Sequence, residues 1–256
     1  MSASSESRRV IVKRTAEEAA GFVADLFKTI ACEAAGERGV CRVALAGGTT
    51  PRGLYGVLAR QAIGGDVPWN QVEIFFGDER DVPHDHVESN FGMAQRTLLD
   101  HLPIPVANVH PMPADSPDLE KAAAEYEQTI RKKVTAGSDG MPRFDLILLG
   151  MGGDGHVASL FPSSSGLQEG KKLVLACFVP VLSRRRMTFT FPLINAARYV
   201  ILLVTGDDKA AVVARVLGGD AQARKGLPAA GVNPKKGVLF MVLDAAAARS
   251  TGLRPE

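Results

Sequence analysis

Apolar residues recur along this chain in two patterns, one typical of short buried strands and the other of amphipathic helices. The apolar runs predict strands at residues 40–46, 72–76, 144–149, 173–179, 186–191, 199–205 and 237–243, and another near residue 109. Helical spacing predicts helices after a capping-box pattern at Thr15, from about 49 to 61, and after a cap at Ser89. Further helices are predicted to open at Ser116-Pro117, with the proline in the first turn, to begin at Asp208, and to form the Ala-rich final segment. Strands that alternate with helices predict βαβ units, so we expect an α/β fold with a mainly parallel sheet, in which residues 72–76 form a second central strand.

The composition is that of an ordinary globular protein, with 46% hydrophobic and 23% charged residues among 256. The chain has no internal repeat and no linker long enough to divide it. We therefore predict a single domain over residues 1–256, with the polar residues 1–9 as a flexible tail. The cysteines Cys32, Cys41 and Cys177 lack metal-binding or redox spacing and lie in or beside apolar segments, so they are expected to be reduced, buried thiols.

The charge and the ends of the chain narrow the choice of partners. A formal net charge of +2 gives no general attraction to nucleic acid or to a membrane surface. No apolar run approaches the roughly 20 residues that span a bilayer, and the polar N-terminus is not followed by the apolar core of a secretory signal. We therefore predict a cytoplasmic protein without a nucleic-acid or membrane partner.

A Gly-Gly-Thr-Thr-Pro segment lies between a predicted strand and a predicted helix, at Gly47, Gly48, Thr49, Thr50 and Pro51. Glycines let backbone N–H groups approach an anion, and the start of the helix adds positive potential and threonine hydroxyls. The segment lacks the Lys of a nucleoside-triphosphate loop, so a single phosphate monoester fits it better. The alternative is a tight strand-to-helix turn without a ligand.

A second glycine-rich segment follows the apolar run 144–149 and ends at His156. Gly150, Gly152 and Gly155 form a GxGxxG pattern, but Pro162 interrupts the helix that a dinucleotide site needs, so we do not expect a nicotinamide cofactor. The glycines instead present His156 at the end of a strand, with Asp154 close enough to orient it, so we interpret it as a candidate catalytic base. The alternative is a histidine with a surface or structural role.

A polar loop, predicted over residues 77–88, follows the run 72–76 and contains several charged residues. Arg80 could hold a substrate or stabilise developing oxyanion charge, positioned by Asp78 and Glu79, or the loop could be solvated with internal ion pairs. Three arginines, 184–186, begin a predicted strand and could bind phosphate or lie on a solvated face.

The loop behind Arg80 also contains acidic and histidine side chains that are possible metal ligands. They are Asp81, His84, Asp85 and His86. The sequence places no further ligand beside the two histidines, so we predict no metal site.

Together these segments resemble the 6-phosphogluconolactonase family, in order and over nearly the whole chain. Residues 45–51 read Leu-Ala-Gly-Gly-Thr-Thr-Pro, residues 76–80 read Phe-Gly-Asp-Glu-Arg, and residues 150–162 read Gly-Met-Gly-Gly-Asp-Gly-His-Val-Ala-Ser-Leu-Phe-Pro. Shorter matches lie at residues 82–83, 89–90, 186–188, 195–197 and 227–229. The last of the three long strings is highly specific, and the Asp-Glu-Arg loop reinforces it.

The related glucosamine-6-phosphate deaminases share a Gly-x-Asp-Gly-His element but continue from it into Phe-Asn-Glu-Pro. This chain continues with Ser-Leu-Phe-Pro at residues 159–162 and has Arg80 where the deaminase loop has Tyr, and both differences favour the lactonases. The chain departs from the lactonase pattern at Ala46, where Ser is usual, and at Ala230, where a polar residue is frequent.

The resemblance implies a three-layer, mainly parallel, Rossmann-like fold with helices on both faces, of the glucosamine-6-phosphate deaminase/ribose-5-phosphate isomerase-like type. It also implies hydrolysis of 6-phospho-D-glucono-1,5-lactone to 6-phospho-D-gluconate, the second step of the oxidative pentose phosphate pathway. A lactone is already an activated ester, so no metal or organic cofactor is expected. The sugar-phosphate lactone would be the small-molecule partner of a monomer or homodimer.

The resemblance assigns roles to single residues as well. His156 would take a proton from the attacking water, Arg80 would stabilise the tetrahedral charge, and Asp78 and Asp154 would be orienting groups. The substrate and its phosphate would lie on Gly47, Gly48, Thr49, Thr50, Asn90 and Arg186. Two other functions remain open, a deaminase-like sugar-phosphate isomerase and a non-catalytic sugar-phosphate sensor.

Overall fold

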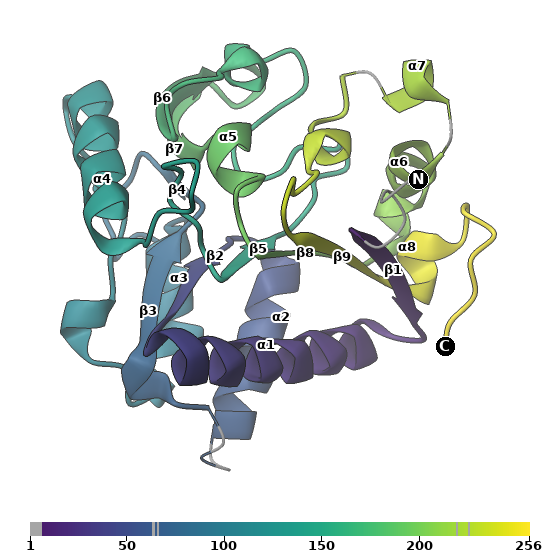
Figure 1. Cartoon of the computed structure of the whole chain (residues 1–256). Coiled ribbons are helices and arrows are strands. Elements are labelled where there is room, and N and C mark those ends of the chain that lie inside the picture. The colour runs from purple at the N-terminus through teal and green to yellow at the C-terminus, as the bar shows by residue number, and fades with distance from the viewer. Residues whose placement is uncertain (1–6, 63–64, 66, 219, 225) are drawn as a thin grey trace.

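The computed structural model describes residues 7–62, 65, 67–218, 220–224 and 226–256. Its central sheet has six strands in the order β1, β9, β8, β5, β2, β3, and all neighbouring pairs are parallel (Figure 1). In that order the strands are Arg8–Lys13, Val238–Asp244, Tyr199–Val204, Leu146–Leu149, Cys41–Leu45 and Val72–Phe76. The predicted parallel α/β fold is confirmed.

The inner strands are apolar at nearly every position because both of their faces are covered. All four residues of β5 are buried, and in β8 and β9 every residue after the first is buried. A strand with one solvated face would instead alternate apolar and polar residues. This double burial explains why the sequence shows these strands as continuous apolar runs.

Helices α1 (Ala16–Arg38) and α2 (Thr49–Gln61) lie on one side of the sheet, below it in Figure 1. The predicted N-terminal cap of α1 is present, since Thr15 Oγ1 accepts a hydrogen bond from Glu18 N at 3.1 Å. The Glu18 carboxylate accepts from Arg14 N at 3.0 Å, one residue earlier than a capping box requires.

A second, smaller sheet lies above the central sheet in Figure 1 and was not predicted. It has three antiparallel strands in the order β4 (Asp78–Arg80), β7 (Arg184–Phe189), β6 (Val174–Val179). The sequence analysis predicted a loop at residues 77–88, because three charged residues carry no strand pattern. Pairing with β7 makes them a strand, with Asp78 opposite Thr188 and Arg80 opposite Arg186.

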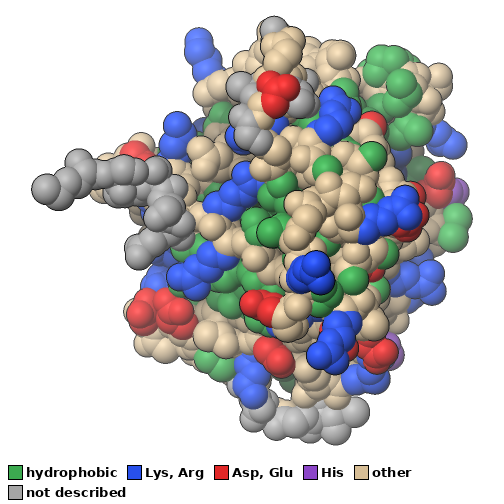
Figure 2. All heavy atoms as spheres, turned by 90° about the vertical axis from the view of Figure 1, so that its right-hand side faces the viewer, with side chains coloured by type: hydrophobic (Ala, Val, Ile, Leu, Met, Phe, Trp, Pro, Cys, Tyr) green, Lys and Arg blue, Asp and Glu red, His purple; other side chains and the backbone are tan. Residues whose placement is uncertain are grey.

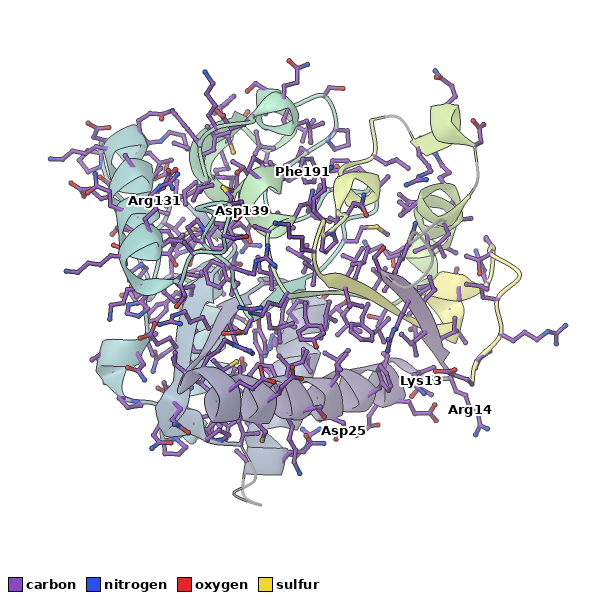
Figure 3. The ribbon with its side chains drawn as sticks, viewed as in Figure 1. Lys13, Arg14, Asp25, Arg131, Asp139 and Phe191 are labelled. Carbon is purple, nitrogen blue, oxygen red and sulfur yellow. The ribbon has the colours of Figure 1, made fainter. Side chains whose placement is uncertain are left out.

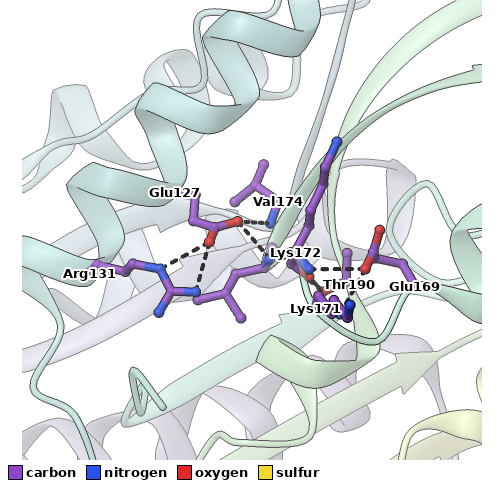
Figure 4. Close-up of polar contacts among 8 residues, drawn as sticks. Glu127, Arg131, Glu169, Lys171, Lys172, Val174 and Thr190 are labelled. Atoms are coloured by element: carbon purple, nitrogen blue, oxygen red, sulfur yellow. Dashed lines mark hydrogen bonds and ion pairs between the residues drawn. The ribbon is translucent and has the colours of Figure 1, made fainter. Parts of the chain in front are cut away.

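Helix α4 (Leu119–Lys133) lies beside β6 and fixes where that strand begins. Glu127 Oε2 accepts hydrogen bonds from the backbone N–H groups of Leu173 and Val174 at 2.7 and 3.3 Å, while Oε1 binds Arg131 (Figure 4). The predicted start of this helix at Ser116-Pro117 is wrong, because Asp118 is the N-cap residue and accepts from Lys121 N.

The remaining helices are shorter. Ser89 caps α3 as predicted, accepting from Gly92 N at 3.0 Å, and the predicted helix from Asp208 begins as a 3-10 turn at Asp207–Lys209. The bounds are α3 Asn90–Thr97, α5 Phe191–Ile194, α6 Ala210–Leu217, α7 Ala221–Arg224 and α8 Ala245–Ala248. In Figure 1, α6 and α8 lie at the β1–β9 end of the central sheet.

The N-terminal segment corrects the sequence analysis. Arg8 and Arg9 belong to β1, so the flexible-tail prediction is wrong for them, and residues 1–6 lie outside the described residues. Lys13, at the end of β1 (Figure 3), pairs with Glu256 at 3.5 Å and lies over the ring of Phe22 at 4.7 Å. These contacts hold the edge strand against both α1 and the C-terminus.

The other edge of the sheet differs from prediction too. Residues 72–76 form β3, which is an edge strand and not a central one. The strand predicted near Val109 is only an isolated bridge to Ile74, with His110 N donating to Ile74 O at 2.8 Å. A short extended segment therefore covers part of the open edge of β3.

The surface agrees with the small net charge. Figure 2 shows the face that carries α6 and α8, where basic and acidic side chains are interspersed. Among the described residues, no helix combines the length and apolar character that crossing a bilayer requires.

The prediction of buried cysteines is correct only for Cys41. Cys177 is half-buried, and Cys32 lies on the exposed face of α1.

His110 gives a testable pH dependence of stability. Its ring packs on Phe75 with centroids 4.5 Å apart, and burial lowers the pKa of His110 from its ordinary value of 6.5, with Lys133 lowering it further. The unfolded chain then binds the proton more tightly, so this contribution to stability is present above pH 6.5 and is lost as pH falls through the lowered pKa. In urea titrations between pH 7.5 and 5, we expect His110→Phe to lose less stability on acidification than the wild type. An equal loss in both proteins would contradict this.

Candidate active site

A cleft of about 490 Å³ opens where β2 and β5 end, between the central sheet and the β4–β7 pair. Ligands bind at this end of parallel strands in open α/β sheets. All ten residues selected from the sequence line the cleft, namely Gly47, Gly48, Thr49, Thr50, Asp78, Arg80, Asn90, Asp154, His156 and Arg186. The structure thus brings together five segments that lie far apart in the sequence.

His156 lies at the end of a tight glycine loop that follows β5. Gly152 N donates to His156 O at 2.9 Å, and Gly155, at φ +83°, has a conformation that favours glycine. The His156 Nδ1 atom lies 2.7 Å from Asp154 Oδ1. A carboxylate accepts hydrogen bonds, so this contact places the proton of a neutral imidazole on Nδ1 and leaves Nε2 able to accept one.

The absence of a side chain at Gly152 makes room for this pair. A Cβ at that position would lie 2.1 Å from His156 Nδ1 and 2.7 Å from Asp154 Oδ1. We expect Gly152→Ala to lower kcat by about 10-fold or more, because both groups must move from their present geometry.

Gly153→Ala is the matched control for this change. A Cβ there would meet only Lys209 Nζ, at an ordinary 3.7 Å. Steady-state kinetics and thermal unfolding of both variants test the prediction, which fails if the two variants have the same kcat.

Asp78 is buried and fully engaged. Its Oδ1 accepts from Asn90 Nδ2 at 3.1 Å, and its Oδ2 accepts from the hydroxyl of Ser159 at 2.7 Å. Asn90 also packs on Gly47, where a Cβ would lie 1.7 Å from Asn90 Oδ1. This network fixes Gly47, the β4 strand and the segment that follows His156 relative to one another.

Glu79 is buried, and most of its hydrogen bonds come from backbone N–H groups. It accepts from the N–H groups of Arg80, Asn90 and Phe91, each at 2.8 Å, and from Ser89 Oγ at 3.1 Å. Burial raises the pKa of Glu79, while the backbone hydrogen bonds oppose that rise. The carboxylate thus satisfies the free N–H groups at the start of α3 and holds both Arg80 and Asn90 in place.

Two arginines face each other across β4 and β7. Arg80 and Arg186 are paired in the antiparallel register, and both line the cleft. Burial lowers the pKa of Arg186, and the charge of Arg80 lowers it further. Among the described residues, no group hydrogen-bonds to the Arg186 guanidinium.

Arg184 and Arg185, which precede Arg186, contact acidic side chains outside the cleft. Arg185 forms a two-pronged contact with Asp81 at 2.8 and 3.2 Å, and Arg184 lies 3.9 Å from Glu88. Arg80 donates to the backbone oxygen of Glu88. Of the three, only Arg186 is in a position to meet a ligand in the cleft.

The Gly-Gly-Thr-Thr-Pro segment, residues 47–51, lies where β2 leads into α2. Gly48, at φ +101°, precedes the first residue of α2, and the first turn of α2 has no acidic side chain to neutralise its positive end. The hydroxyl of Tyr55 bonds to both backbone groups of Ala46, which fixes the strand exit. The Thr50 hydroxyl lies 2.9 Å from that of Thr205, so it is tied to the end of β8.

Several cleft residues were missed by the sequence analysis. Ser159 binds Asp78, Phe161 stacks on His156, and Lys209 adds a third cation near Gly153. Ser159 and Phe161 belong to the family string at residues 150–162, and that membership could have indicated them as cleft residues. The sequence around Lys209 has no comparable motif. The exposed apolar tip of the β6–β7 hairpin, Val181 and Leu182, also lines the cleft.

The residues considered as metal ligands do not converge. His84 Nε2 lies 2.9 Å from Met112 O, His86 Nδ1 accepts from Glu88 N, and Asp81 binds Arg185. Among the described residues, no group of three or more His, Cys, Asp or Glu is arranged to hold a metal ion.

Comparison with known proteins identifies the family. Residues 14–241 match the sequence profile of the family described as glucosamine-6-phosphate isomerases/6-phosphogluconolactonase. The chain belongs to this family. A 6-phosphogluconolactonase of Synechocystis sp. is 42% identical to it over 223 residues, which are 87% of this chain and 89% of that protein.

Solved structures of this family agree. The 6-phosphogluconolactonase of Trypanosoma brucei has a TM-score of 0.82 and 29% identity, and the match covers 96% of this chain and 99% of that one. A monomeric glucosamine-6-phosphate deaminase has a TM-score of 0.79 at 21% identity, covering 94% and 99%, which shows a common fold. The fold type and the family inferred from the sequence are therefore confirmed.

Proposed function

We propose that this chain hydrolyses 6-phospho-D-glucono-1,5-lactone to 6-phospho-D-gluconate, the second step of the oxidative pentose phosphate pathway. The observation that carries the proposal is the His156–Asp154 pair, at 2.7 Å, in one cleft with Arg80, Arg186 and the start of α2. A base, a site for developing negative charge and a phosphate site are what hydrolysis of a phosphorylated lactone needs. The 42% identity to a 6-phosphogluconolactonase supports the same assignment.

The proposed reaction begins when His156 Nε2 takes a proton from a water molecule. The water oxygen attacks the lactone carbonyl carbon, and the tetrahedral oxyanion forms beside Arg80. Collapse of this intermediate breaks the bond between the carbonyl carbon and the ring oxygen, and His156 returns its proton to that oxygen. The product is a carboxylic acid that releases one proton to water.

Asp154 and Asp78 have different parts in this proposal. Asp154 contacts Nδ1 and so favours the tautomer whose Nε2 is free to accept a proton. Asp78 already accepts from Asn90 and Ser159, so it orients the neighbouring groups and is not available as the base.

The 6-phosphate is proposed to lie between Arg186 and the residues Gly48, Thr49 and Thr50. The free guanidinium of Arg186 and the positive end of α2 border the same cleft. Lys209, also a lining residue, adds positive charge to it.

The proposal keeps the other expectations drawn from the sequence. The chain acts as one domain over residues 1–256, as a monomer or homodimer, in the cytoplasm, and without a metal or organic cofactor.

The deciding experiment compares two substrates. Hydrolysis of freshly prepared lactone is followed with a product-specific coupled assay after subtraction of spontaneous opening, and ammonia release is followed with glucosamine 6-phosphate. Fast lactone turnover without ammonia release supports the proposal. Ammonia release without lactone turnover indicates a deaminase, and sugar-phosphate binding without either reaction indicates a sensor.

A further inference from the structure

An aromatic ring lies directly on the proposed catalytic imidazole. The rings of Phe161 and His156 are stacked, with centroids 4.2 Å apart and planes inclined by 25°. Phe161 is half-buried and lines the cleft beside His156. The proposed reaction assigns no step to Phe161.

The chain adopts an unfavourable turn to make this contact. Leu160 N donates to Val157 O at 2.9 Å, closing a turn in which Ala158 has φ +48°. That left-handed conformation is unfavourable for a residue with a side chain. The turn folds the segment back on itself, so that Phe161 meets the imidazole five residues before it.

The stack supplies a restraint that the Asp154 contact lacks. The hydrogen bond at Nδ1 fixes the position of that atom but does not by itself fix the plane of the ring. The edge of the ring that carries Nδ1 and Cε1 occupies the place where a side chain at Gly152 would lie, since a Cβ there would be 2.1 and 2.2 Å from those two atoms. A ring stacked on one face of the imidazole fixes the plane and so the direction of Nε2.

We propose that Phe161 is a positioning residue for His156, whose stacked ring holds the imidazole plane in the orientation that directs Nε2 at the attacking water. This inference rests on the proposed function, in which His156 is the base. It also accounts for a difference between the two branches of the family, since the Phe-Asn-Glu-Pro string of the deaminases has Glu at the position of Phe161. An apolar ring at this place leaves Asp154 as the one carboxylate that contacts the imidazole among the described residues.

The first test compares Phe161→Leu with Phe161→Tyr in lactone hydrolysis. Leucine keeps apolar bulk but cannot stack, so we expect kcat to fall about 10-fold with KM within about twofold, because the substrate contacts stay in place. Tyrosine restores an aromatic face and should recover most of kcat. Phe178→Leu is the control, since Phe178 is 58% exposed and does not line the cleft.

A spectroscopic readout makes the test independent of turnover. In the wild type, the ring current of Phe161 should move the carbon-bound ring protons of His156 upfield in proton–carbon NMR spectra, assigned against a His156→Asn variant. Phe161→Leu should remove this shift and Phe161→Tyr should keep it. The shift reports whether the stack exists in solution, and kcat of the same folded variants reports whether the stack matters for turnover.

A charged variant tests the electrostatic part. Phe161→Glu places a second carboxylate beside the imidazole and stabilises its protonated form, so the acid limb of the pH–rate profile should move to higher pH. The inference is overturned if the leucine variant keeps the wild-type kcat, or if neither the His156 resonances nor the acid limb responds to changes at position 161. A wild-type protein without lactone turnover would instead refute the proposed function, and the NMR comparison would still report on the stack.

Discussion

His156→Ala is expected to lower kcat for the lactone by about 10²- to 10⁴-fold, the largest effect of any single change considered. The variant keeps the cleft but has no group that can take a proton from the attacking water. The side chain is partly exposed, and its hydrogen bonds are confined to Asp154, two residues away. The fold should therefore survive, and thermal unfolding should show a melting temperature close to that of the wild type.

His101→Ala is the matched control for this prediction. His101 is exposed, and among the described residues its ring hydrogen-bonds to the backbone oxygen of Arg96 alone, at 3.2 Å. Its removal should leave kcat unchanged. If His156→Ala turned over the lactone as fast as His101→Ala, His156 would not be the base.

Arg186→Ala is expected to lower kcat/KM for the phosphorylated lactone by roughly 10- to 100-fold. This factor corresponds to the binding free energy that one charge-assisted hydrogen-bonding group contributes. The effect should lie mainly in KM, because the proposed partner of Arg186 is the phosphate and not the reacting carbonyl. A lactone without the phosphate provides the sharper test. On glucono-1,5-lactone, the variant and the wild type should have similar kcat/KM.

Arg184→Ala serves as the control for this pair of substrates. Its side chain is 56% exposed, and its partner Glu88 lies 3.9 Å away, outside the set of cleft residues. The control should behave like the wild type on both lactones. A loss in Arg186→Ala that is equal with and without the phosphate would show that Arg186 serves the reacting centre instead.

The central sheet could be predicted from the sequence because its inner strands are buried on both faces and therefore consist of continuous apolar residues. The sequence could not predict β4, since Asp78, Glu79 and Arg80 become a strand only by pairing with residues more than a hundred positions later. It also missed β1, whose short apolar stretch lies behind Arg8 and Arg9 and pairs with the last strand of the chain. Both strands depend on partners that no local pattern indicates.

Some residues of the candidate site could likewise be predicted from the sequence, and others could not. The glycine loops, His156 and Arg80 could be selected because each stands directly behind an apolar run, where parallel strands present ligand-binding residues. Ser159 could not be given a role, because its partner Asp78 is 81 positions away. The choice of Arg186 among three adjacent arginines came from the family pattern. The structure places Arg184 and Arg185 against acidic groups outside the cleft.

The pairing of Arg80 with Arg186 across β4 and β7 affects the stability of the protein without a ligand. Two like charges held opposite each other oppose folding until an anion lies between them. An anion that binds only the folded chain adds RT ln(1 + [L]/Kd) to stability, which is about 2.7 kcal/mol at a hundred times Kd. The melting temperature of this protein should therefore report the phosphate content of its surroundings, rising in a phosphate buffer and rising further as sugar phosphates accumulate.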